Sequence, residues 1–256
     1  MPVRIEKNDV RATVVIDDPG RRNPLSVGVM DELCDATAAV LADDEVRVIV
    51  YTGAGDRAFS AGGDLANSFA DDPVGLHRER GRLADLFRMM TAGGKPTVAR
   101  VNGDALAGGF GLAVACDITI CVEGARLGTP EAGVGLWPMM ISAVLMRAMP
   151  RKAVLEMMLT GRLITPEEAK SLGAVSLVVP GDALDSEVDR VVAALASRSA
   201  VVTRLGRDAF YSTGDADFDT ALDRLQAGLT AVMATEDAEE GVTAFLEKRD
   251  PEWKGR

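Results

Sequence analysis

Short apolar runs recur through the first 180 residues of the chain, each bounded by turn-forming residues. Apolar and polar positions alternate over residues 10–16, as expected for a half-buried strand. Residues 46–51, 97–101 and 117–122 are nearly continuous apolar runs rich in β-branched residues. Such runs are typical of strands that are buried on both faces. The pattern therefore predicts several buried strands in one sheet.

Helical spacing of apolar positions separates these strands. Ser26 is a plausible N-cap for a helix, and a second helical pattern covers residues 74–90. The apolar face of the first helix consists of Val29, Leu33, Ala36 and Val40. Strand, helix and strand then follow one another as in an α/β protein.

The chain becomes mostly helical toward its end. Apolar helical runs at residues 139–149 and 151–159 are separated by Pro150, and the pattern after residue 182 is helical with breaks near residues 198 and 214. We therefore predict a core of residues 1–195 and a C-terminal helical segment of residues 196–256.

Two glycine-rich segments each leave an apolar strand. Ala58–Leu65 (AFSAGGDL) follows the strand at 46–51, and Gly103–Gly111 (GDALAGGFG) follows the strand at 97–101. Glycine lets the chain turn sharply and lets a ligand approach the bare backbone. Two backbone N–H groups aimed at one oxygen would form an oxyanion hole. The alternative interpretation is that both segments are tight turns of a parallel sheet.

One acidic residue stands in unusually apolar company. Glu131 lies in RLGTPEAGVGLWP, among proline, glycine, valine and tryptophan. Burial disfavours the charged form of a carboxyl group and raises its pKa, which suits a group that moves protons at neutral pH. An exposed loop glutamate is the alternative.

Composition excludes several classes of function. The chain has 256 residues with 28 Lys and Arg against 39 Asp and Glu, a net charge of −11, and no basic patch for nucleic acid. It has no apolar run long enough to span a membrane and no signal-peptide layout at its start. Three cysteines in apolar surroundings and a single histidine, His77, favour a reduced cytoplasmic protein without a metal site.

Four segments, taken in order, resemble the crotonase superfamily, which is also called the enoyl-CoA hydratase/isomerase superfamily. They are AFSAGGDL, KPTVARVNGDALAGGFGLAVACDITIC, LGTPEAGVGLWP and LTGRLITPEEAKSLGAVSLVV, and the resemblance covers residues 5–180. It implies a spiral of ββα turns with two roughly perpendicular sheets. It also implies C-terminal helices that assemble a homotrimer or hexamer, and an acyl-CoA substrate. Coenzyme A would be part of the substrate, with no metal or redox cofactor.

The resemblance also assigns roles to individual residues. The amides of Gly63 and Gly108 fall at the two oxyanion positions, and Glu131 falls at a catalytic glutamate. Ala61, Asp64 and Leu65 fall in the segment that lines the adenine and pantetheine parts of coenzyme A, and Arg22 falls near its phosphates, with Arg21 as the alternative. Trp137, close to Glu131 in the chain, is a candidate wall of the acyl pocket.

One departure from the family pattern bears on the reaction. Hydratases of the family use two glutamates, and where the first stands in GGGCEL this chain has Gly111 in GGFGL. A single carboxylate can still move a proton between Cα and Cγ, so we favour isomerisation of a 3-enoyl-CoA to a 2-enoyl-CoA. The alternatives are hydration with Asp104 or Asp64 as a substitute acid, another reaction of the same fold such as thioester hydrolysis or decarboxylation, and acyl-CoA binding without turnover.

Overall fold

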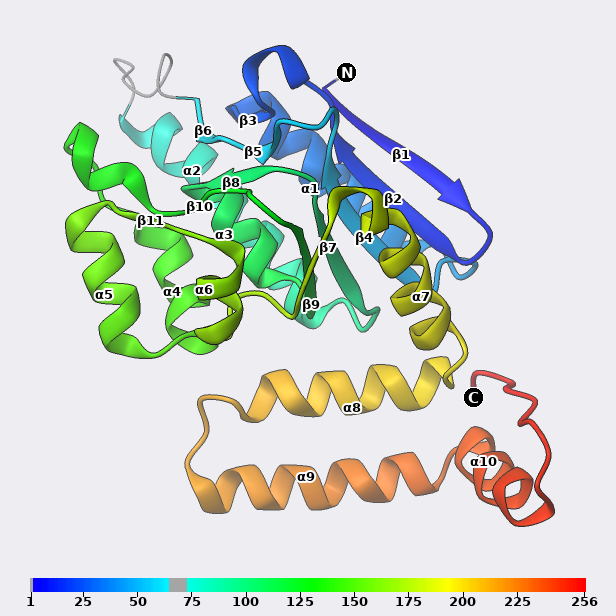
Figure 1. The fold of residues 1–256 in the computed structure, drawn as a ribbon. Coiled ribbons are helices and arrows are strands. Elements are labelled where there is room, and N and C mark those ends of the chain that lie inside the picture. Colours follow the sequence, from blue (N-terminus) through cyan, green and yellow to red (C-terminus); the bar gives the residue numbers. More distant parts are fainter. Residues whose placement is uncertain (1, 65–72) are drawn as a thin grey trace.

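The strands of the core alternate between two sheets as the chain advances (Figure 1). A computed structural model describes residues 2–64 and 73–256. The six-stranded sheet has the order β1 (Val3–Asn8), β2 (Arg11–Ile16), β4 (Val48–Gly53), β7 (Thr97–Val101), β9 (Ile118–Val122) and β12 (Leu177–Val179). The four-stranded sheet has the order β11 (Leu163–Ile164), β10 (Leu127–Gly128), β8 (Asp104–Leu106) and β5 (Ala58–Ser60). β3 (Pro24–Leu25) and β6 (Gly62–Gly63) form a small third sheet, in addition to the two that we expected.

A helix or helical turn completes each passage through the two sheets. β4, β7 and β9 are each followed by a strand of the four-stranded sheet, namely β5, β8 and β10. The helices that follow are α2 (Pro73–Ala92), α3 (Gly108–Ala115) and, after the 3₁₀ turn η3 (Pro130–Val134), α4 (Met139–Ala148). This order confirms the predicted spiral of ββα turns.

The central strand β4 of the six-stranded sheet is buried on both faces, as its continuous apolar run predicted. Ile49 and Tyr51 of β4 point into the main core, which also contains Leu33 of α1 (Val27–Ala42). Val48 and Val50 point the other way, into a smaller core under α7 (Leu184–Ala196). Successive side chains of a strand point to opposite faces, so both faces of this strand need apolar residues.

The N-cap and the apolar face predicted for α1 are confirmed, whereas strand β1 was not predicted. The Ser26 hydroxyl accepts a hydrogen bond from the Val29 amide at 3.4 Å, and all four residues of the predicted apolar face of α1 are buried. β1 was missed because it is an edge strand in which only Val3 is buried, so charged residues break the apolar pattern. The remaining elements of the core are α5 (Arg151–Thr160), α6 (Pro166–Ser171) and the 3₁₀ turns η1 (Pro19–Arg21) and η4 (Gly181–Ala183).

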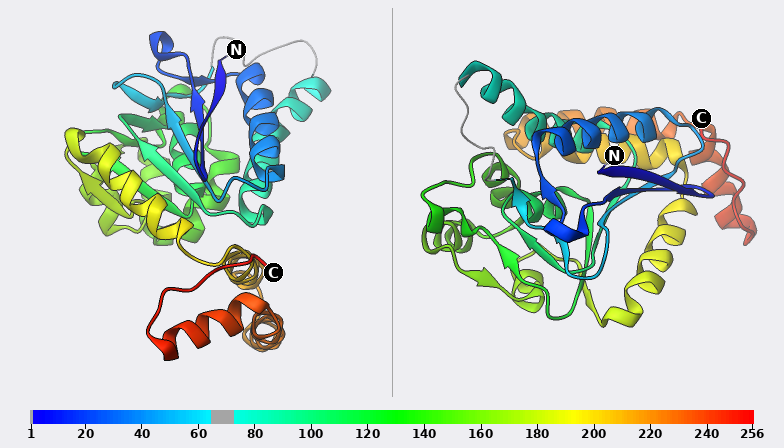
Figure 2. Two further views of the ribbon diagram at one scale, coloured as in Figure 1. Left: turned by 90° about the vertical axis from the view of Figure 1, so that its right-hand side faces the viewer. Right: turned by 90° about the horizontal axis from the view of Figure 1, so that it is seen from above.

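Three helices at the end of the chain form a layer beside the core, at the bottom of Figure 1. They are α8 (Ala200–Thr213), α9 (Phe218–Met233) and α10 (Glu236–Glu247), and the break between α9 and α10 was not predicted. Figure 2 shows α8 between the core and α9. Buried Asp237 accepts hydrogen bonds from the Ser199 hydroxyl and from the amides of Lys254 and Gly255, which holds the C-terminus against the start of α8.

A partly buried ion pair joins α8 to the core. The Arg207 Nε lies 2.9 Å from Asp117 Oδ2, and the Arg207 side chain is only 7% exposed. Asp117 also accepts hydrogen bonds from the amide and hydroxyl of Thr97 in β7 and from the Tyr211 hydroxyl. The other Arg207 nitrogens donate to the carbonyl oxygens of Met90 and Thr91 at the end of α2. One arginine therefore connects three elements that are distant in sequence.

We expect Arg207→Ala to lower the free energy of unfolding by about 3–5 kcal/mol, since it leaves a partly buried carboxylate and two carbonyl oxygens without their donor. Denaturant titration followed by circular dichroism measures this loss. The matched control is Arg147→Ala, because the ion pair between Arg147 and Asp215 has side chains that are 59% and 71% exposed. That control should lose less than about 1 kcal/mol. Equal losses in the two variants would contradict the role given to Arg207.

Candidate active site

Three parallel strands of the four-stranded sheet bring the candidate residues to one edge. β5, β8 and β10 are neighbours, with Ser60 and Leu127 both paired to Ala105. Adjacent strands of a sheet lie about 4.8 Å apart, and parallel strands end at the same edge. The segments with Gly63, Gly108 and Glu131 directly follow the carboxyl ends of these strands. The topology therefore gathers residues that lie far apart in the sequence.

The two glycine segments are in direct contact. Gly62 has a φ of +87°, a backbone conformation that glycine adopts without a steric penalty. A Cβ atom on Gly62 would lie 2.6 Å from the Cβ of Ala107 and 3.2 Å from the amide nitrogen of Gly108. A side chain at residue 62 would therefore force the segments apart.

The second segment presents the start of a helix to this edge. α3 begins at Gly108, and Ala107 before it provides no side-chain cap. The first amides of a helix have no intrahelical acceptor, so they are suited to bind an oxygen that carries negative charge. Ala107 itself has a φ of +51°, which is strained for alanine, and its amide donates to the Gly128 carbonyl at 2.9 Å. A hydrogen bond to neighbouring β10 thus holds the turn at Ala107 from which α3 begins.

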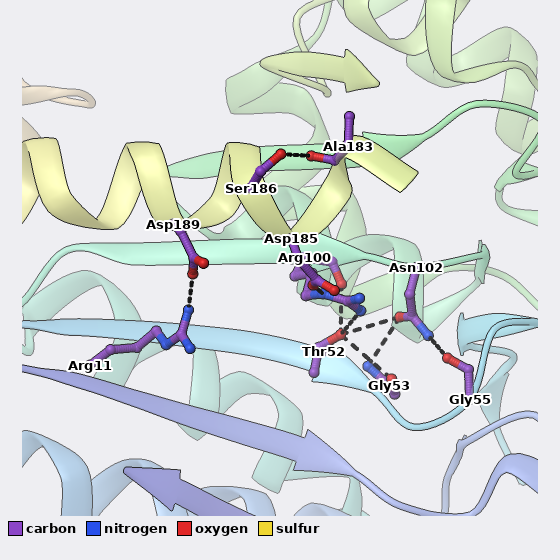
Figure 3. Close-up of polar contacts among 10 residues, drawn as sticks. All are labelled: Arg11, Thr52, Gly53, Gly55, Arg100, Asn102, Ala183, Asp185, Ser186 and Asp189. Atoms are coloured by element: carbon purple, nitrogen blue, oxygen red, sulfur yellow. Dashed lines mark hydrogen bonds and ion pairs between the residues drawn. The ribbon is translucent and has the colours of Figure 1, made fainter. Parts of the chain in front are cut away.

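Two buried asparagines, which our sequence analysis did not single out, hold the loop before β5. Asn23 donates to the carbonyl oxygens of Ala54 and Ala58 at 3.0 and 2.8 Å. Asn102, at the end of β7, accepts from the Gly53 amide and donates to the Gly55 carbonyl at 2.7 Å (Figure 3). Both asparagines stand beside a proline or a glycine in the sequence, a local pattern that indicates a turn. Which loop they bind depends on the tertiary structure.

Glu131 lies in η3 with one carboxylate oxygen unpartnered. Its Oε2 atom is buried and has no hydrogen-bond partner among the described residues. Burial raises the pKa of this carboxyl above its ordinary value, and a hydrogen bond from its own amide opposes that effect only in part. The hydroxyl of fully buried Thr129, two residues earlier, is likewise without a partner in the described part of the chain. A carboxyl group with one buried oxygen that lacks a protein partner is able to exchange a proton with a ligand.

The residues expected to contact coenzyme A lie along the first glycine segment and the loop before β3. The Ala61 amide donates to the Arg22 carbonyl at 2.9 Å, and the Arg22 side chain is exposed. Arg21, the alternative to Arg22, has an Nη1 atom 3.4 Å from Asp64 and also pairs with Asp18. Leu65 lies outside the described residues.

Three other candidate residues from the sequence are paired with another side chain or exposed at the surface. Asp104 is at the opposite end of β8 from Gly108, and its carboxylate binds Arg126 through the amide and the guanidinium. His77 on α2 is exposed, and Trp137, between η3 and α4, is 38% exposed. An acid already paired with arginine is a poor substitute for a free catalytic carboxyl.

Two surface hollows lie elsewhere on the protein. One, of about 290 Å³, lies between the six-stranded sheet and α7, where Arg11 pairs with Asp189 and Arg100 pairs with Asp185 (Figure 3). The second, of about 340 Å³, adjoins it, and neither is lined by Gly63, Gly108 or Glu131. Arg11 and Arg100 each already have an acidic partner, so neither is an unpaired cation for a ligand.

The part of the chain that the structure describes, residues 2–64 and 73–256, contains neither a metal-binding cluster nor a membrane-spanning helix. Within that part of the chain, no three His, Cys, Asp or Glu side chains are grouped so as to hold a metal ion. No helix there is long and apolar enough to cross a membrane.

Comparisons with known proteins agree over nearly the whole chain. The sequence model of the enoyl-CoA hydratase/isomerase family matches residues 6–256. A Thermus thermophilus protein with the provisional name enoyl-CoA hydratase is 40% identical, covering 97% of this chain and 99% of its own. The crotonyl-CoA hydratase of Syntrophomonas wolfei is 34% identical, with 96% and 95% of the two chains covered.

A solved structure gives the same result. Human enoyl-CoA hydratase domain-containing protein 3 superposes with a TM-score of 0.94 at 32% identity, over 99% of this chain and 100% of that one. Sequence and fold agree, and the chain belongs to the enoyl-CoA hydratase/isomerase family of the crotonase superfamily.

Proposed function

We propose that the protein isomerises a 3-enoyl-CoA to a 2-enoyl-CoA, with Glu131 as its single acid–base group. The observation that carries this proposal is the buried Glu131 Oε2 atom, which has no partner among the described residues. Family membership supports an acyl-CoA thioester as the substrate. Gly111 stands where a hydratase of the family has its other glutamate, so the sequence favours a reaction that needs one carboxylate.

One carboxylate is enough to balance this reaction. Ionised Glu131 removes a proton from Cα, and the electron pair of that C–H bond moves into the thioester to form an enolate. The amides of Gly63 and Gly108 donate hydrogen bonds to the thioester oxygen, where the negative charge develops. Protonated Glu131 then delivers its proton to Cγ, the double bond moves from C3–C4 to C2–C3, and Glu131 returns to its ionised form. Water is neither consumed nor released.

Binding of the coenzyme A portion is assigned to the residues around the first glycine segment. Ala61, Asp64 and Leu65 would line its adenine and pantetheine parts, with Arg22 or neighbouring Arg21 near the phosphates. Arg22 is exposed and forms no ion pair with another described residue, so its guanidinium is available to a phosphate. Trp137 would border the acyl chain.

Hydration of a 2-enoyl-CoA is the second candidate, because relatives carry names such as crotonyl-CoA hydratase and 2,3-dehydroadipyl-CoA hydratase. An assay of both substrates side by side distinguishes the two reactions. Conjugated-thioester absorbance increases when a 3-enoyl-CoA is isomerised and decreases when a 2-enoyl-CoA is hydrated. Conversion of the 3-enoyl substrate alone would support isomerisation. Binding without conversion of either substrate would favour an acyl-CoA-binding protein or another thioester reaction.

We also propose a cytoplasmic location. Cys34, Cys116 and Cys121 are buried free thiols, as expected in a reducing compartment. Some relatives are named as mitochondrial proteins, so the matrix is the alternative.

Replacing the carboxyl of Glu131 by an amide tests its role directly. Glu131→Gln keeps the shape of the side chain but removes the proton acceptor, so we expect kcat to fall by about 10²–10⁴-fold. Steady-state assays with a 3-enoyl-CoA measure this loss, and a circular dichroism spectrum checks the fold. Glu123→Gln, at an exposed glutamate, is the matched control and should retain activity. Undiminished turnover by Glu131→Gln would remove this residue from the mechanism.

The same substitution should stabilise the protein at neutral pH. Because the pKa of Glu131 is raised in the folded state, the folded protein binds this proton more tightly than the unfolded chain does. Ionisation of Glu131 therefore destabilises the folded state. This cost is absent below the pKa of the unfolded chain, about 4.3, and is complete above the folded pKa. We therefore expect Glu131→Gln to raise the free energy of unfolding at pH 7 relative to wild type, with the difference shrinking toward pH 4. A difference that is constant with pH, measured by denaturant titration, would contradict this account.

A homotrimer, or a hexamer formed from two trimers, is our proposed assembly. Large apolar side chains on the three C-terminal helices are 62–82% exposed: Phe210, Phe218, Leu229, Met233, Phe245 and Leu246. Exposed apolar surface of this kind marks a protein interface. Light scattering should give at least three times the 27.0 kDa chain mass. The double variant Leu229→Ser/Met233→Ser should be monomeric, whereas Ile5→Ser on the edge strand should not. A monomeric wild type would refute the proposal.

A further inference from the structure

Gly111 is a point of close contact between α3 and α4. A Cβ atom on Gly111 would lie 2.6 Å from the Cβ of Ile141 and closer still to its Cγ2. Real carbon atoms in van der Waals contact are about 3.5–4.0 Å apart, so no larger residue fits while Ile141 is present. Ile141 is 2% exposed and belongs to the main apolar core.

This contact lies on the face of α3 that also carries Gly108. Gly108 is the first residue of α3, and Gly111 follows three positions later. Residues three apart on a helix lie on one face, and side chains lean toward the N-terminus. A side chain at residue 111 would therefore lean toward the Gly108 amide. Ile141 fills that volume from the facing helix.

We propose that Ile141 is the specificity-determining residue of the reaction: it fills the volume of a second acid–base group and keeps water away from the reacting carbons. This inference rests on the proposed site but not on isomerisation being the reaction observed. Hydration adds a water oxygen to Cβ and a proton to Cα, so it requires a water held beside Cβ. A buried water needs two to four polar partners, and an isoleucine side chain supplies none.

The proposed exclusion of water by Ile141 also bears on where the proton travels. A proton that Glu131 takes from Cα would then be returned to Cγ of the same molecule before it could exchange with solvent. Isomerisation in D₂O should therefore place little deuterium in the product. A smaller residue at position 141 should admit water and allow exchange.

The experiment compares single and paired substitutions with two readouts, deuterium content of the isomerised product by mass spectrometry and the rate of 2-enoyl-CoA hydration. Met146→Ala changes an exposed side chain of the same helix, so it is the matched control and should behave as wild type. Ile141→Ala should raise deuterium incorporation severalfold. Gly111→Glu combined with Ile141→Gly should gain hydration by about tenfold or more, since Ile141 Cα would remain 3.5 Å from the new Cβ and is in ordinary contact.

The outcomes separate this inference from the proposed function. Suppose that the wild type isomerises and that Ile141→Ala and the double variant fold but match it in both readouts. That result would overturn the inference alone. Rapid hydration by the wild type would overturn both. A wild type that does neither reaction would count against isomerisation, while hydration gained by the double variant would still support the inference. If the double variant fails to fold, the deuterium content with Ile141→Ala decides.

Discussion

The site depends on how closely two stretches of bare backbone approach each other. Gly62 and the Ala107–Gly108 turn are in contact where a single added Cβ would collide, and Gly109 packs in the same way against Ser60. This approach brings the start of α3 beside the end of β5. Parallel pairing of β5, β8 and β10 then fixes the same edge for Glu131. Gly62 is therefore a geometric requirement, because a side chain at this position would push the two glycine segments, which contain the Gly63 and Gly108 amides, apart.

Stability and chemistry oppose each other at Glu131. A buried carboxyl with an unpartnered oxygen destabilises the folded protein once it ionises, and a natural sequence retains such a group only where other interactions hold the fold. Those interactions lie nearby but outside the site. Asn23 and Asn102 hold the loop before β5, and Arg207 joins α2, β7 and α8 through buried hydrogen bonds. These side chains have hydrogen-bond partners within the protein, whereas Glu131 Oε2 has none among the described residues.

The packing of α3 against α4 links the shape of the core to the choice of reaction. Gly111 and Ile141 are complementary in volume, so neither position can change freely without the other. A change from one catalytic carboxyl to two would thus require a rearranged helix contact as well as a new acid. Family membership and fold do not determine which reaction is performed; in our proposal, the residues in this contact decide where a proton acceptor or a water can stand.

Much of the architecture follows from the sequence alone. Continuous apolar runs predicted β4, β7 and β9, and the Ser26 cap with its helical apolar spacing predicted α1, because strand and helix periodicities are local properties. Four ordered segments identified the family and the ββα spiral. The edge strand β1 was missed, since a strand with a single buried residue has no apolar pattern to read.

Only the tertiary structure decided what each candidate residue has around it. It paired Asp104 with Arg126, left Glu131 Oε2 without a described partner, and placed Ile141 against Gly111. It also gave structural roles to Asn23 and Asn102, whose turn-forming character was visible but whose partners were not. The reason is physical. Burial and hydrogen bonding depend on contacts between residues far apart in the chain, and a local pattern contains no information about which distant group will fill the space beside it.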